Sequence, residues 1–152
     1  MKKITSFTVD HDKILPGMYI SRIDGDVTTF DLRTRRPNMG DYMDTRTMHS
    51  VEHMLATYLR NGEIGQNVIY FGPMGCQTGF YFLFDENTLS CAEAVALLKD
   101  VFSKAADFDG PMPGMSEIEC GNYRNLDISL AKSCCGFYAD VINHWTEEKL
   151  AY

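Results

Sequence analysis

The chain has 152 residues, enough for one domain to bury a hydrophobic core without disulfides or a structural metal. Its formal net charge is -7 and its lysines and arginines are scattered, so nucleic acids and anionic membranes are poor candidate partners. No run of about 18 apolar residues occurs, and the N-terminal stretch MKKITSFTVDHDKI lacks the apolar segment of a signal peptide. We therefore expect a single catalytic domain over residues 1–152, located in the cytoplasm, with no nucleic acid or membrane partner.

The cysteines do not form the pattern of a secreted disulfide framework. They are five in number, which leaves one unpaired, and two of them are adjacent and poorly suited to pairing with each other. Reduced thiols that serve a metal or a reaction fit this pattern better. The cysteines stand at positions 76, 91, 120, 134 and 135.

The first third of the chain is rich in β-prone residues. The segment ITSFTVD (4–10) is expected to form a strand, and residues 18–33 a hairpin that turns at an Asp-Gly-Asp sequence. In the second strand of this hairpin alternate side chains face opposite sides. Phe30 and Leu32 therefore share one face, and Asp31 and Arg33 share the other.

Helical and β-prone segments then alternate. A helix is expected from Asp44 to Asn61, with Asp44 or Thr45 as its N-cap. Strands at 67–71 and 80–84 are expected to follow, around the turn GPMGCQTG. The capping box Ser90-Cys91-Ala92-Glu93 predicts a helix through about Ala106, and a last helix is expected over 127–149. Together these elements predict an α+β fold, a two-layer domain with a mainly antiparallel sheet packed against helices.

The first of these helices carries the sequence HSVEH. At about 100° per residue, His49, Glu52 and His53 form a stripe beside the apolar face of the helix. Imidazoles four residues apart can bind one ion, and Glu52 lies close enough to act on a bound substrate or water. The order H-x-x-E-H is the inverted form of the zinc metallopeptidase motif. On this helix alone, a metal site and an ordinary helix with two hydrogen-bonded histidines remain equal alternatives.

Cys120 is the best candidate for a third ligand. It follows a Gly- and Pro-rich loop, in the sequence ECGNY, where an irregular backbone can bring a thiolate to a helix built elsewhere. A thiolate is a good partner for a soft to borderline divalent ion, and two histidines with one cysteine leave an open coordination position, as in catalytic sites. The alternative is a small apolar residue in a loop.

Three further residues carry groups suited to a polar substrate. Cys76 lies among glycines in PMGCQTG, and its thiol could serve as acid, base or nucleophile if a nearby cation favours the thiolate. Its alternative is a buried structural cysteine. His11 and Arg33, both near the ends of expected strands, could contact substrate, although such residues often cap a strand or are simply solvated.

Taken together, the segments SFTVDH, FDLR, HSVEH, GPMGCQTGFY and ECGNY resemble the S-ribosylhomocysteine lyases, the LuxS family that makes the precursor of the quorum-sensing signal autoinducer-2. The resemblance implies that His49, His53 and Cys120 bind Fe(II), one ion per subunit, and that zinc can also occupy the site. It also implies that Glu52 and Cys76 are the acid/base pair. The substrate-binding residues that it implies are Ser6, His11, Arg33 and Arg60.

The family's reaction and assembly follow from the same resemblance. S-ribosylhomocysteine would undergo two carbonyl migrations and a β-elimination, giving homocysteine and 4,5-dihydroxypentane-2,3-dione and recycling homocysteine to the methyl cycle. The resemblance also implies a homodimer with active sites at the interface, each built from both chains. One departure concerns the segment before PMGC, where family members often carry an acidic residue and a serine and this chain has Tyr70-Phe71-Gly72.

Two rival interpretations use the same helix. A small inverzincin-type metallopeptidase fits H-x-x-E-H, but it would use a downstream carboxylate as third ligand within a much larger chain. A non-catalytic, metal-responsive binding protein would close its site with four ligands and would have no use for Glu52 beside them.

Overall fold

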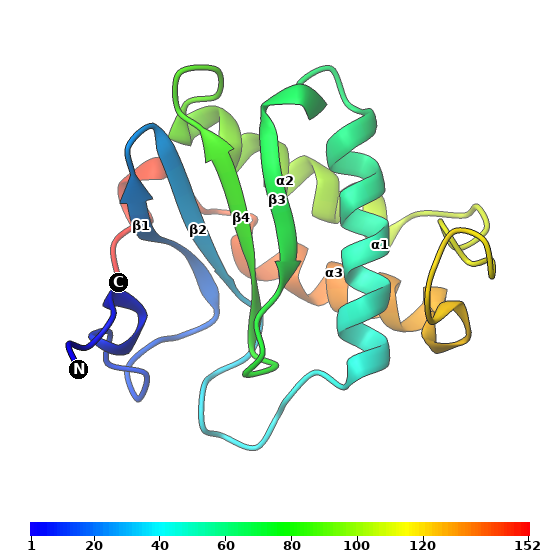
Figure 1. Ribbon diagram of the computed structural model, residues 1–152, viewed down its shortest axis with the longest axis horizontal. Coiled ribbons are helices and arrows are strands. Elements are labelled where there is room, and N and C mark those ends of the chain that lie inside the picture. The colour runs from blue at the N-terminus through cyan, green and yellow to red at the C-terminus, as the bar shows by residue number, and fades with distance from the viewer.

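A computed structural model describes the backbone of residues 1–152 and every side chain except that of Thr5. Within this described part, four antiparallel strands form one sheet in the order β1-β2-β4-β3, and helices pack against one of its faces (Figure 1). The strands are β1 (Gly17–Asp24), β2 (Val27–Arg33), β3 (Val68–Pro73) and β4 (Gly79–Asp85), and the helices are α1 (Thr45–Asn61), α2 (Cys91–Ala106) and α3 (Ile128–Ile142). The predicted two-layer α+β architecture is confirmed.

The two faces of the sheet differ because side chains alternate along β2 and β4. Phe30 pairs with Phe82, and both point into the core shared with the helices. Asp31 pairs with Tyr81, and these side chains lie on the opposite face, where they line a pocket together with Arg33. The predicted hairpin and the predicted alternation in FDLR are therefore both confirmed.

The helices begin where the sequence predicts. Asp44 caps α1 by accepting from the Thr47 backbone N–H at 2.7 Å. Ser90 and Glu93 form the reciprocal capping box at the start of α2.

Among the described residues, no helix combines the length and apolarity needed to cross a bilayer. The side chains that α1 buries against the sheet and the other helices include Val51, Met54, Leu55 and Leu59.

Two expectations about the chain's ends are wrong. Residues 4–10 form no strand but a short 3-10 turn, Thr5–Phe7, followed by further turns. Part of the free edge of β1 is instead taken by the C-terminal segment, because Ile20 N–H donates to the Leu150 carbonyl at 2.7 Å. The last helix ends at Ile142 rather than at 149, since the chain turns there and Trp145 Nε1–H donates to the Met18 carbonyl at 2.7 Å. Both termini therefore lie beside β1 (Figure 1).

Candidate functional site

Three candidate ligands from distant parts of the chain meet beside α1. His49 and His53 project from one side of the helix, and Cys120 comes from the irregular segment between α2 and α3. Their ligand atoms all lie within 4.8 Å of one another, and His49 Nε2 lies 3.4 Å from Cys120 Sγ. All three side chains are half-buried, so a bound ion would remain within reach of a substrate.

Hydrogen bonds of the two Nδ1 atoms fix the tautomers of His49 and His53. His53 Nδ1 lies 3.0 Å from the Pro113 carbonyl oxygen, and His49 Nδ1 lies 2.9 Å from the Asn125 amide oxygen. Both oxygens can only accept, so each Nδ1 carries the proton and donates. In the neutral imidazole this tautomer leaves the lone pair on Nε2, the atom that can then bind a metal.

The segment between α2 and α3 is shaped to lie against these histidines. Gly114 has a φ of +66°, and a Cβ there would come within 2.8 Å of His53 Nδ1. Cys120 Sγ accepts from the Asn122 backbone N–H at 3.4 Å, a contact that holds the sulfur beside His49. Two neutral imidazoles and a thiolate suit a borderline divalent metal with an open coordination position, so these residues fit such an ion.

Glu52 lies on α1 next to His53, and its side chain is half-exposed. Within the described part of the chain its carboxylate has no hydrogen-bond or ion-pair partner, whereas both histidines are fixed. A free carboxylate beside a metal-binding group can exchange protons with a substrate held there.

Four other candidate residues share a second pocket, of about 210 Å³, on the sheet face opposite the helices. They are Ser6, His11, Arg33 and Cys76. His11 Nδ1 lies 3.0 Å from the Val9 carbonyl and therefore donates to it, which leaves Nε2 as an acceptor. The pocket thus holds a thiol, an imidazole, a hydroxyl and a cation, groups that suit a polyhydroxylated substrate.

Arg33 is the buried charge at the centre of this pocket. Its Nη2–H donates to Asp31 Oδ2 at 2.5 Å, and its Nη1 lies 2.6 Å from Thr78 Oγ1 and 3.8 Å from Cys76 Sγ. Burial opposes the charge of the guanidinium, but the Asp31 carboxylate outweighs burial and raises the pKa of Arg33. A permanent positive charge therefore lies beside the Cys76 thiol.

The residues that line this pocket and that sequence reasoning did not select include Asp31, Tyr81 and Tyr152. Alternation in FDLR placed Asp31 beside Arg33, so pattern alone could have selected it. Tyr81 could have been found in the same way, from its strand. Nothing local links Tyr152 to a site 121 residues away, yet its hydroxyl donates to Asp31 Oδ2 at 2.7 Å.

The two groups of candidate residues do not meet within one chain. None of the three ligands His49, His53 and Cys120 is among the described residues that line the Cys76 pocket. Arg60 belongs to neither group, because its guanidinium donates to the Ile69 carbonyl at 3.3 Å near the end of α1.

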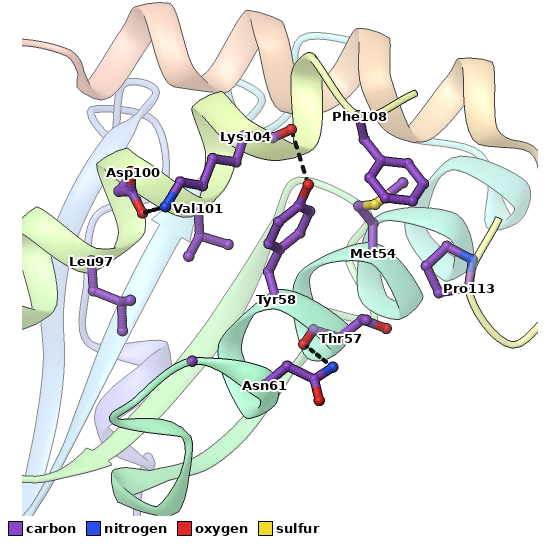
Figure 2. Close-up of a pocket in the computed structure, with 11 residues that line it drawn as sticks. Met54, Thr57, Tyr58, Asn61, Leu97, Asp100, Val101, Lys104, Phe108 and Pro113 are labelled. Atoms are coloured by element: carbon purple, nitrogen blue, oxygen red, sulfur yellow. Dashed lines mark hydrogen bonds and ion pairs between the residues drawn. The ribbon is translucent and has the colours of Figure 1, made fainter. Parts of the chain in front are cut away.

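A third cavity, of about 510 Å³, lies between α1 and α2 (Figure 2). Its walls are largely apolar, and the Tyr58 ring meets the Phe108 ring edge to face at 6.1 Å. The Tyr58 hydroxyl is already engaged with the Lys104 carbonyl at 3.3 Å. This lining suits a polar sugar poorly, and none of the candidate site residues contributes to it.

Comparison with known proteins identifies the family. A family model described as S-Ribosylhomocysteinase (LuxS) matches residues 4–149. The chain belongs to the LuxS family. Proteins named S-ribosylhomocysteine lyase are similar to it over 100% of this chain and 99% of their own length, with 44% identity in Finegoldia magna, 43% in Clostridium beijerinckii and 42% in Borreliella afzelii.

LuxS membership confirms the resemblance of the sequence motifs and does not favour the metallopeptidase interpretation. The departure at Tyr70-Phe71-Gly72 has a structural counterpart in this LuxS chain. The Tyr70 side chain lies over Gly72, where a Cβ would fall 1.9 Å from the phenol oxygen. Tyr70 lines a further pocket together with Ser6 and Tyr81, both of which also line the Cys76 pocket. The two pockets are therefore adjacent along the open face of the sheet.

Proposed function

We propose that this chain is a metal-dependent S-ribosylhomocysteine lyase that forms homocysteine and 4,5-dihydroxypentane-2,3-dione, the precursor of autoinducer-2. The observation that carries the proposal is the His49, His53 and Cys120 group in a chain that matches the LuxS family model over residues 4–149. The proposal includes the whole chain, 1–152, as a single catalytic domain that works in the cytoplasm.

The metal that we propose is Fe(II), one per subunit, in a site that zinc can also occupy. The ligand atoms would be Nε2 of His49, Nε2 of His53 and Sγ of Cys120. The two Nε2 atoms are available because the Nδ1 atoms make the hydrogen bonds to Asn125 and Pro113. A divalent metal bound there supplies Lewis acidity, which lowers the cost of removing a proton next to the sugar carbonyl.

The substrate explains why two proton-transferring groups are needed. Its thioether is on ribose carbon 5, and elimination of the thiolate requires an acidic proton on carbon 4. That proton becomes acidic only when the carbonyl has moved from carbon 1 to carbon 3, by two successive proton shifts. No water is needed as a nucleophile, which separates this chemistry from peptide hydrolysis.

Glu52 and Cys76 are the residues that we assign to these proton transfers. The Glu52 carboxylate can take a proton from carbon and return it, because no other described group engages it. The Cys76 Sγ can do the same as thiolate and thiol, since Arg33 Nη1 lies 3.8 Å from it and Thr78 Oγ1 lies 3.1 Å from it. Ser6, His11 and Arg33 would bind the sugar, and Arg60 the homocysteine part.

A homodimer is part of the proposal because one chain keeps the two groups apart. The pocket that holds Cys76 lies on the sheet face away from the helices, and the ligand group lies beside α1. Phe7, Leu15 and Tyr70 near this open face are exposed apolar side chains that a second copy would cover. We propose that each active site takes Glu52 and the metal from one chain and Cys76 from its partner.

Mixed dimers test this arrangement. If Glu52 and Cys76 in one site come from different chains, a hybrid of Glu52→Gln and Cys76→Ala subunits contains one site with both defects and one with none. Random mixing of two inactive variants should then restore about a quarter of the parental activity, because half the dimers are hybrids with one intact site. No recovery in dimers shown by mass spectrometry to be mixed would contradict the shared site.

Asn125 should matter to metal affinity although it binds no metal. Asn125→Ala removes the acceptor that holds His49 Nδ1–H, so the imidazole loses its orientation. We expect metal affinity to fall about 10–100-fold, measured by competition with a chromophoric chelator. Asn122→Ala is the matched control, because Asn122 contacts Cys120 through its backbone N–H, which the substitution keeps.

The function itself is tested by thiol release. Anaerobically prepared, metal-loaded protein should convert S-ribosylhomocysteine to homocysteine, detected with a thiol reagent, and activity should decline in air as Fe(II) oxidises. Metal analysis on the same sample identifies the ion. Absence of thiol release from a sample with full metal content would overturn the assignment.

A further inference from the structure

Asp31 is a buried carboxylate shared between two donors. It is 1% exposed, and its Oδ2 accepts from Arg33 Nη2 at 2.5 Å and from the Tyr152 hydroxyl at 2.7 Å. Its Oδ1 is buried and has no hydrogen-bond partner among the described residues. A buried charge is costly unless hydrogen bonds or an opposite charge compensate it. Each donor to the Asp31 carboxylate therefore has a large effect on how strongly this carboxylate interacts with the Arg33 guanidinium.

Arg33 divides its guanidinium between this carboxylate and the Cys76 side. It is 3% exposed, with Nη2 on Asp31 and Nη1 toward Thr78 Oγ1 and Cys76 Sγ. The Asp31 carboxylate offsets part of the positive charge of Arg33 at Cys76 Sγ, and it offsets less of that charge when another donor neutralises the carboxylate. The effective charge of the Asp31 carboxylate therefore controls how strongly Arg33 stabilises negative charge on Cys76 Sγ.

Contacts with Tyr19 and with β1 hold Tyr152 beside the Asp31 carboxylate. Its ring stacks on Tyr19 with centroids 4.9 Å apart, and Tyr19 is itself fixed by donating to the Leu15 carbonyl at 2.9 Å. The preceding backbone is tied to β1 by the Leu150 carbonyl. Burial, followed by the Asp31 charge, raises the pKa of Tyr152, so its hydroxyl stays protonated and remains a donor.

We propose that Tyr152 is a positioning residue for the Cys76 thiol, acting through Asp31 and Arg33. Its hydroxyl shares Asp31 Oδ2 with Arg33 Nη2 and neutralises part of the carboxylate charge, so that more of the positive charge of Arg33 acts on Cys76 Sγ through Nη1. The inference deepens the proposed function and rests on it, since Cys76 is there the group that transfers protons.

Among the described residues around the pocket, no other hydroxyl donates a hydrogen bond to Asp31. Tyr81 lies on the same face, but no hydrogen bond joins it to Asp31, and burial followed by the Asp31 charge raises its pKa. His11 donates to the Val9 carbonyl rather than to the carboxylate. Among the described residues the hydroxyl that reaches Asp31 is that of Tyr152.

The test is the alkylation of Cys76 in Tyr152→Phe, which removes the hydroxyl and keeps the stacked ring. Metal-loaded protein is treated with iodoacetamide at pH 7, and modified peptides are quantified by mass spectrometry over time. We expect Cys76 to react about threefold more slowly than in the parent, because the Asp31 carboxylate then offsets more of the Arg33 charge that favours the nucleophilic sulfur. Cys91, whose pKa burial and the Glu86 contact raise to about 11, serves as internal reference and should not change.

Controls separate the hydroxyl from general loosening of the fold. Tyr42→Phe removes a hydroxyl from an exposed tyrosine outside the pocket and should leave the Cys76 rate at the parental value. In turnover assays, Tyr152→Phe should lower kcat with KM unchanged, since the hydroxyl acts on Cys76 and not on substrate binding. A parental Cys76 alkylation rate in Tyr152→Phe, or an equal slowing at Cys91, would overturn the inference.

This experiment keeps the two proposals apart. Alkylation requires no substrate, so slower modification of Cys76 in Tyr152→Phe supports the hydrogen-bond chain even if the parent releases no thiol. Absence of thiol release from the parent counts against the lyase activity alone. Thiol release by the parent together with unchanged alkylation in the variant counts against Tyr152 alone.

Discussion

Replacing Glu52 with glutamine should lower turnover of S-ribosylhomocysteine by about 10²–10⁴-fold, the usual contribution of a positioned proton-transfer group. Glutamine has nearly the same shape, but its amide cannot accept and return a proton. Because the carboxylate is half-exposed and has no partner among the described residues, its loss should not destabilise α1. Metal content should therefore stay unchanged while homocysteine release falls, measured by metal analysis and thiol assay on one sample.

The control for this variant is Glu63→Gln, which removes an exposed carboxylate just after α1 and should retain full turnover. A Glu52→Gln protein that kept parental kcat with a full complement of metal would remove Glu52 from the mechanism. Loss of metal together with activity would instead make Glu52 a ligand, contrary to the role assigned to it.

Replacing Cys120 with alanine should abolish tight metal binding. The two imidazoles would then be the remaining members of the group. The site would lose one coordination bond and the negative charge of the thiolate. We expect affinity to fall by more than the roughly 100-fold limit typical of losing an outer-shell contact. Competition with a chelator, followed by metal analysis after gel filtration, measures the effect.

Cys91→Ala is the matched control, because Cys91 is also half-buried but donates to Glu86 and lies outside the metal group. It should bind metal like the parent. Parental affinity in Cys120→Ala would show that another residue completes the site.

Local rules account for most of the fold. The Asp-Gly-Asp turn and the alternation in FDLR predicted the first hairpin, and the caps at Asp44 and Ser90 predicted where two helices begin. The errors occur where distant segments compete. The sequence of residues 4–10 is compatible with a strand, but the edge of β1 that such a strand would extend is partly occupied by Leu150. Trp145 bonds to β1 and ends the helical path of α3 early.

The site was predictable as a set of residues but not as an arrangement. H-x-x-E-H indicated a face with two ligands, since helical spacing alone brings His49 and His53 together. The meeting of His49 with Cys120, 71 residues later, depends on how the segment after α2 folds back, and no local pattern encodes it. The same holds for the contact of Tyr152 with Asp31.

The packing of Tyr70 over Gly72 couples the side chains that positions 70 and 72 can carry. With any side chain at position 72, its Cβ would lie 1.9 Å from the present phenol oxygen, so the ring would be pushed out of its place beside the open sheet face. Introducing a side chain at position 72 would therefore require the Tyr70 ring to swing away from Gly72, or Tyr70 to be replaced as well. A segment exchange with a relative that has a side chain at position 72 is therefore best designed to change both positions together.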